Sequence, residues 1–165
     1  EIVHDGWAFL EESALQYMIH ENIYANFECV VNLIVRQPRK FAHILGTLMQ
    51  HGGDDRLLFA TGCAVNHPNP IIEAFLNFQM PQDLVDGFGF AQLTPETKAK
   101  FLGGNMARLH GIDIPAAREK IAKDRWSKLR ANGKPAPWSA HRRRLSAPDY
   151  PADHRGIRSP TASVA

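Results

Sequence analysis

Four side chains that can bind metals or transfer protons stand just after short apolar segments of this sequence: His4, Glu28, Cys63 and His67. A neutral imidazole and a thiolate are good ligands for divalent metals, and a carboxylate or an imidazole can move protons. Residues that follow the strands of a parallel sheet gather at one edge of that sheet. The pattern therefore suggests metal contacts by His4 and Cys63, and catalytic roles for Glu28 and His67.

Each of these residues also has a structural interpretation. A lone histidine such as His4 is often structural, and Glu28 could pair with an arginine or cap a backbone N–H group. Cys63 follows Gly62 directly, so in an extended strand it faces the opposite way, and only a sharp turn at Gly62 re-aims it. Without that turn Cys63 is a buried structural thiol. His67 is followed by two prolines, which favours a loop-shaping role.

Strands and helices alternate around these residues. Pro38 suits the first turn of a helix, and the glycine pair at 52–53 suits its end. Alternating strands and helices indicate a parallel α/β sheet, and three strands are too few to close a barrel. The apolar periodicity predicts strands at residues 1–4, 23–28 and 57–61 and helices at 7–20, 38–52 and 70–78.

The later part of the chain contains further helix signals. Thr94 and Pro95 form an N-cap followed by a proline at the first helical position. We expect that helix to stop at the glycine pair 103–104. Further helices are predicted at 105–110 and 115–131, whereas residues 80–92 are predicted to be irregular.

Composition separates a body from a tail. The chain has 165 residues, 44% of them hydrophobic, and a formal net charge of +2. Residues 133–165 contain six Lys or Arg, two Asp and five of the 11 prolines, which predicts disorder. We therefore divide the chain into a folded domain, 1–132, and a basic, Pro-rich tail, 133–165. The arginine run 142–144 makes nucleic-acid binding conceivable, but a solvated tail is the simpler interpretation.

The cysteine content and the hydropathy of the sequence indicate the cellular compartment in which we expect the protein. Two cysteines form no disulfide framework, and no apolar run reaches membrane-spanning length. No secretory leader is visible, so we expect a cytoplasmic protein without a membrane partner. The chain begins with Glu1 and enters a strand at once, so we expect it to be the later part of a longer protein.

Several short motifs resemble the amidohydrolase superfamily in its amidohydrolase 2 branch. Ile2-Val-His-Asp-Gly6 resembles a strand-end His-Gly-Gly element, and Arg56-Leu-Leu-Phe-Ala-Thr-Gly62 resembles an Arg-Ile-Leu-Phe-Gly-Thr-Asp strand. His67-Pro68 is similar to the His-Pro that often follows that strand. Thr94–Leu109 is similar to the family's closing segment. The resemblance covers about residues 1–115 and corresponds to the later part of the family's barrel.

The resemblance implies a partial (β/α)8 TIM-type barrel that holds the later strands and helices. It also implies a divalent metal, most often zinc, that activates water for hydrolysis or assists decarboxylation of a small, carboxylated substrate. His4 corresponds to the family's mid-barrel histidine. The late aspartate, a metal ligand and proton acceptor, falls on Gly62.

Two departures from the family pattern limit this expectation. The chain has no His-x-His motif, and Gly62 has no side chain to bind metal or accept a proton. We expect the isolated chain to bind zinc very weakly and to show no turnover. The alternative is a non-catalytic partial barrel that assembles with a missing N-terminal half, another chain or a second copy of itself.

Overall fold

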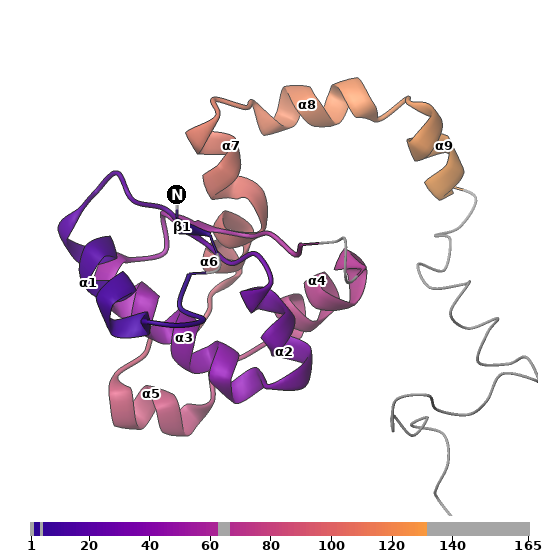
Figure 1. Ribbon diagram of the computed structural model, residues 1–165. Coiled ribbons are helices and arrows are strands. Elements are labelled where there is room, and N and C mark those ends of the chain that lie inside the picture. The colour runs from indigo at the N-terminus through magenta and orange to yellow at the C-terminus, as the bar shows by residue number, and fades with distance from the viewer. Residues whose placement is uncertain (1, 4, 63–66, 132–165) are drawn as a thin grey trace, which may run out of the picture. The chain divides into compact units, whose positions relative to one another are not determined.

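A computed structural model describes residues 2–3, 5–62 and 67–131 of the chain. Its described residues form a three-stranded parallel sheet in the order β1-β2-β3. Figure 1 labels β1 and the helices that follow it along the chain. His4, Cys63 and the tail at 133–165 lie outside the described residues. The strands are β1 (Ile2–Val3), β2 (Ala25–Asn26) and β3 (Leu57–Leu58), and Asn26 pairs with Val3 on one side and Leu58 on the other.

Helices connect the parallel strands. α1 (Leu10–Ile19) lies between β1 and β2, so it begins three residues later than predicted. The short helices η1 (Val30–Asn32) and α2 (Leu33–Arg36) follow β2. α3 (Pro38–Gly52) confirms both predicted ends: Pro38 occupies the first turn, and Gly53 ends the helix at φ 73°.

The prediction that residues 80–92 are irregular is wrong, because α5 (Gln82–Phe88) lies there. Leu84 on this helix packs with Met80, Phe90 and Ala42 in a small buried cluster. This burial supplies the stabilisation that the glycine-rich local sequence lacks. Gly89, at φ 71°, ends the helix.

Of two further predicted boundaries, one agrees with the structure and one differs from it. The helical backbone is interrupted at the glycine pair, as predicted, because Gly103 has non-helical dihedral angles, φ 169° and ψ −17°, between α6 and α7. The predicted helix 115–131 is broken in two, and the Asp124 side chain accepts a hydrogen bond from the Ser127 N–H group at the start of the second piece. The bounds are α4 Pro68–Asn77, α6 Pro95–Ala99, η2 Lys100–Gly104, α7 Asn105–Leu109, α8 Ile114–Ile121 and α9 Arg125–Ala131.

The chain divides into two compact units, Glu1–Lys123 and Asp124–Ala165. The first unit contains the sheet and every helix from α1 to α8. In the second unit, α9 is the described element.

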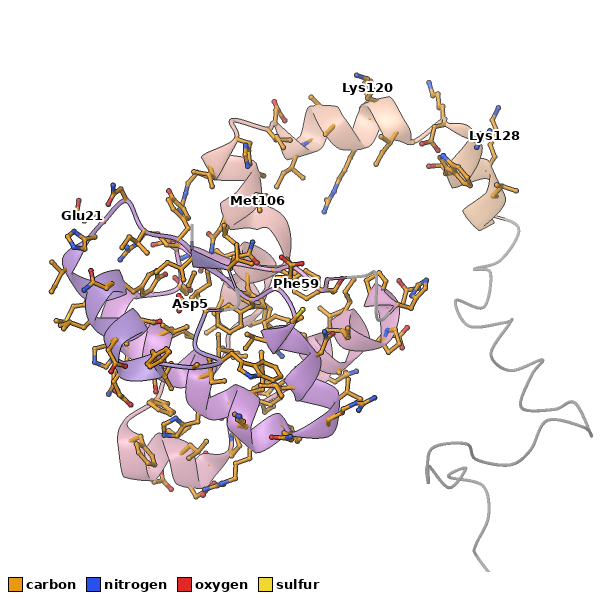
Figure 2. All side chains as sticks on the ribbon, in the orientation of Figure 1. Asp5, Glu21, Phe59, Met106, Lys120 and Lys128 are labelled. Atoms are coloured by element: carbon orange, nitrogen blue, oxygen red, sulfur yellow. The ribbon has the colours of Figure 1, made fainter. Side chains whose placement is uncertain are left out.

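The core lies between the sheet and the helices. Phe27, just after β2, makes edge-to-face contacts with Phe41 of α3 and Phe101 of η2, with ring centroids 6.1 and 5.1 Å apart. All three rings are buried, and burying each contributes roughly 2–3 kcal/mol. Phe59, labelled in Figure 2, extends this aromatic cluster through an edge contact with Phe101. The sheet is thus fixed from the helical side.

A second set of contacts closes the amino-terminal edge of the sheet, where the strands begin. The Arg56 guanidinium donates hydrogen bonds to the carbonyl oxygens of Tyr17, His20, Ile23 and Gly52, at 2.7–3.3 Å. It also lies 4.2 Å from the centre of the Tyr17 ring. One side chain thereby ties the ends of α1 and α3 to the beginnings of β2 and β3.

The closing helices are attached to the same edge by Asn105. Its buried amide donates to the carbonyl oxygens of Asp54 and Leu57, at 2.7 and 2.9 Å. Lys100 forms ion pairs at 3.1 Å with Asp54 and with Asp55, and these pairs raise the Lys100 pKa. Asn105 thereby buttresses the closing helices.

Candidate functional site

Glu28 and Gly62 lie next to each other at the carboxyl-terminal edge of the sheet, where the strands end. A β-carbon built on Gly62 would lie 3.4 Å from both Cγ and Oε1 of Glu28. They come from neighbouring strands, because β2 and β3 pair in parallel just before them. The carboxylate of Glu28 therefore stands beside the position at which the resemblance places an aspartate.

A tight turn after β2 holds Glu28 in place. The Asn26 side-chain oxygen accepts a hydrogen bond from the Glu28 backbone N–H at 2.9 Å, and the Glu28 carbonyl accepts one from Val30 N–H at 2.7 Å. Cys29 has φ 60° inside this turn, a conformation that residues with a β-carbon rarely adopt. The turn directs two potentially reactive side chains, Glu28 and Cys29, to the same edge.

Neither structural role considered for the Glu28 carboxylate is observed. Within residues 2–3, 5–62 and 67–131, its oxygens form no ion pair with a lysine or arginine and accept no hydrogen bond from a backbone N–H group. A carboxylate at a strand end without such partners is available to a ligand or to a proton.

Gly62 has a backbone that suits glycine. Its φ is 58°, in the left-handed region. An added β-carbon would lie 3.0 Å from Sγ of Cys29, closer than normal carbon–sulfur contacts. The space a side chain would need at position 62 is therefore partly occupied by Cys29 and Glu28.

Asn32 supports the end of β3 and leaves one acceptor unused. Its amide nitrogen donates to the carbonyl oxygen of Thr61, which immediately precedes Gly62, at 3.2 Å. Its Oδ1 atom is buried and has no hydrogen-bond partner in the described part of the chain. A buried acceptor without a donor costs about 1–3 kcal/mol, so a ligand donor here gains from satisfying it.

Asp5 is a second carboxyl group at this edge, in the connection between β1 and α1 (Figure 2), and unlike Glu28 it is buried. It is 1% exposed, and neither oxygen makes a hydrogen bond of ordinary geometry to the described residues. Burial raises its pKa, an effect that the Ser13 side chain and the Gly6 N–H group only partly offset. The sequence analysis missed it, although an acid directly after an apolar strand was the available signal.

His67 has the loop-shaping role that its neighbouring prolines suggested. It is the N-cap of α4, and its Nδ1 accepts a hydrogen bond from the Asn69 backbone N–H at 3.2 Å. A neutral ring bonded in this way carries its proton on Nε2. Its catalytic role stays a prediction. The two predicted metal contacts, His4 and Cys63, lie outside the described residues.

The described side chains do not by themselves form a metal site. Within that part of the chain, no three His, Cys, Asp or Glu residues come close enough together to hold an ion. Glu28 and Cys29 supply two potential ligands, fewer than the three protein ligands typical of a catalytic zinc site.

The arrangement defines a class of protein. Parallel α/β folds place ligand sites just beyond the carboxyl ends of their strands, and here a free carboxylate, a thiol and an unused amide oxygen lie there. Within that class the chain belongs to the amidohydrolase 2 family, because the family model described as amidohydrolase matches residues 4–112. No curated protein and no solved structure matches the chain significantly.

Two general properties are known for this family. The family comprises hydrolases and related decarboxylases, and its members generally use a divalent metal. None of the helices in the described residues is long and apolar enough to cross a membrane.

Proposed function

We propose that the chain forms the later strands of a (β/α)8 barrel, and that its carboxyl edge catalyses hydrolysis or non-oxidative decarboxylation of a small, carboxylated molecule. The observation that carries this proposal is the Glu28 carboxylate beside Gly62. Family membership supplies the reaction class.

In this proposal Glu28 is the proton acceptor of the site. Its neighbour Gly62 contributes no acid, and no described cation holds the Glu28 carboxylate in a structural ion pair. A general base of this kind accelerates a reaction by about 100-fold to 10,000-fold. His67, which follows β3 and caps α4, is assigned to substrate contact.

The metal assignment is part of the proposal. Zinc is the preferred ion because imidazole and thiolate are its usual ligands, and His4 and Cys63 are the proposed contacts. The described residues alone do not complete such a site, so no catalytic step is built on the ion. The thiol of Cys29 is free, which fits the reducing cytoplasm proposed for the protein.

The test places the chain behind the earlier half of an active amidohydrolase 2 enzyme. We expect this chimera to act on small aromatic or unsaturated acids or their derivatives, measured as CO2 or acid release. Glu28→Gln should lower kcat by about 100-fold or more without changing Tm. Glu73→Gln, an exposed residue of α4, is the matched control and should leave kcat unchanged.

A double variant locates the carboxylate. Glu28→Gln combined with Gly62→Asp should recover only a small part of the lost activity, because the new acid lies beside position 28 but is crowded by the Cys29 sulfur and the left-handed backbone. Unchanged kcat in the Glu28→Gln chimera contradicts the assigned role. A folded but inactive chimera contradicts the catalytic proposal as a whole.

The second candidate function is assembly without catalysis. β1 is one of the two edge strands of the described sheet, and Val3 on it is 46% exposed. On α1, Leu15, Met18 and Ile19 are exposed at helical spacing. An open strand edge beside an apolar helix face favours a partner that adds a strand and a helix. A monomer with cooperative unfolding in analytical ultracentrifugation and calorimetry contradicts this candidate.

A further inference from the structure

A groove runs between the segment that precedes α1 and the first turns of α3. Its volume is about 690 Å³, and its walls include Trp7, Phe9 and Leu10 on one side and Lys40 and His43 on the other. This volume is typical of a small-molecule site. Glu28, Cys29 and Gly62 do not line the groove, so it is separate from the site proposed above.

Two aromatic side chains of the groove are exposed to solvent. Trp7 is 51% exposed and Phe9 is 77% exposed. Phe9 also has φ 55° and ψ 44°, a left-handed conformation that residues with a β-carbon avoid. Such an exposed ring adds little to the core, and two neighbouring rings offer a flat apolar surface to a planar ligand.

The charges of the groove are of one sign. No acidic side chain lines it among the described residues. Lys40 places its Nζ atom 5.5 Å from the centre of the Trp7 ring and has no acidic partner in the described part of the chain. Arg39, by contrast, is bound through both of its terminal nitrogens to Asp83, at 3.0 and 2.5 Å. One uncompensated cation therefore faces the aromatic surface.

We infer that this groove binds a planar, aromatic monocarboxylate. The ligand ring packs against Trp7 and Phe9, and its carboxylate pairs with the Lys40 ammonium group. A dianion such as a phosphate ester needs a second available cation, and the pairing of Arg39 with Asp83 removes the nearest one. The groove is a second ligand site and does not depend on the function proposed for the carboxyl edge.

The test titrates 2-naphthoate, with neutral 2-naphthamide as its matched ligand, into the whole 15N-labelled chain. We expect naphthoate to shift the backbone amides of residues 6–10 and 37–44 and to bind more tightly than naphthamide. Lys40→Met keeps the alkyl stem and removes the charge, so it should weaken naphthoate binding by roughly threefold to fivefold. Its effect on naphthamide should be negligible. Lys123→Met, exposed and remote in sequence, should change neither affinity.

Two further variants separate this site from the carboxyl edge. Trp7→Leu should weaken both ligands by roughly tenfold through the lost ring contact, while Tm reports that the fold is kept. Glu28→Gln should leave both affinities unchanged. The inference is overturned by naphthoate shifts confined to other residues, by equal naphthoate affinity in the Lys40→Met chain, or by the absence of binding at millimolar ligand.

Discussion

The two edges of the sheet differ in how completely their polar groups are satisfied. At the amino-terminal edge, Arg56 and Asn105 use their donors on backbone carbonyl oxygens. At the carboxyl-terminal edge, Asp5 and Asn32 keep buried oxygens without hydrogen-bond partners in the described residues. Hydrogen bonds at the first edge stabilise the fold, whereas the second retains unused acceptors that cost stability and suit a ligand site.

Backbone conformation shows the same difference. Cys29 and Gly62 adopt positive φ values, 60° and 58°, side by side at the carboxyl edge. The described residues that begin β2 and β3 have negative φ values. The positive φ near this edge is that of Gly53, at the end of α3. Unusual conformations persist where the surroundings over-determine them, and they are concentrated at functional sites. Substitutions at the two edges can therefore test whether the amino-terminal edge stabilises the fold and the carboxyl-terminal edge holds the ligand site.

The largest effect is expected at Arg56. Arg56→Met removes the guanidinium donor from four carbonyl oxygens, of which that of His20 keeps the Ile23 N–H group, so the free energy of unfolding should fall by about 3 kcal/mol, measured by urea denaturation. Arg56→Lys should recover only a small part, because an ammonium group cannot reach all four oxygens. A lysine variant as stable as the original chain contradicts the role assigned to the guanidinium fork.

Asn105→Ala should be the next most destabilising change. It leaves the buried carbonyl oxygen of Leu57 and the partly buried one of Asp54 without the Asn105 donor, and should lower the free energy of unfolding by about 2 kcal/mol. Asn77→Ala is the control, because the Asn77 amide bonds a carbonyl on the exposed surface of α4. If the two variants unfold at the same urea concentration, the amino edge is not specially stabilised by Asn105.

Gly62→Ala probes the carboxyl edge. The left-handed backbone and the nearby Cys29 sulfur should together lower the free energy of unfolding by roughly 1–2 kcal/mol. Gly111→Ala has a similar φ of 63° and no atom within 4 Å of the added carbon, so it measures the backbone cost alone. Adding Cys29→Ala to Gly62→Ala should remove the difference between the two glycine variants. Persistence of that difference shows that Cys29 does not occupy the space at position 62.

The smallest expected effect has the opposite sign. Asp5→Asn removes a buried carboxylate whose pKa is raised by burial, and it should stabilise the chain at pH 7 by up to about 1 kcal/mol. Because the folded-state pKa exceeds the unfolded value, Asp5 weakens the fold as pH rises from the unfolded pKa through the folded one. The urea midpoints of the two chains should therefore agree below the unfolded-state pKa of Asp5 and should diverge as the pH rises above that pKa. A variant less stable than the original at pH 7 indicates that the Asp5 carboxylate has a stabilising partner.

The sequence predicted those parts of the fold whose signals are local. α3 was predicted from Pro38 at its start, its apolar stripe and the glycine pair at its end. α5 was missed because its stability comes from the burial of Leu84 in a cluster that includes Ala42, a residue distant in the sequence. The break between α8 and α9 was missed because apolar periodicity continues across it.

The candidate site was predictable only where its sequence signals are local. The position of Glu28 at a strand end follows from its segment alone. Its contact with Gly62 depends on the register that pairs Asn26 with Leu58, and no short pattern specifies that register. The isolation of Asp5 depends on burial by α1 and its surroundings, which is a tertiary property.

The hydrogen bonds of Arg56 also determine how this unit opens. One guanidinium contacts residues 33, 36 and 39 positions earlier in the chain, together with Gly52 at the end of α3. α1 cannot detach from the sheet without also breaking the contacts that end α3 and begin β2. We therefore expect native-state hydrogen exchange in α1 and α3 to follow one shared opening event, with the two helices behaving as a single cooperative unit.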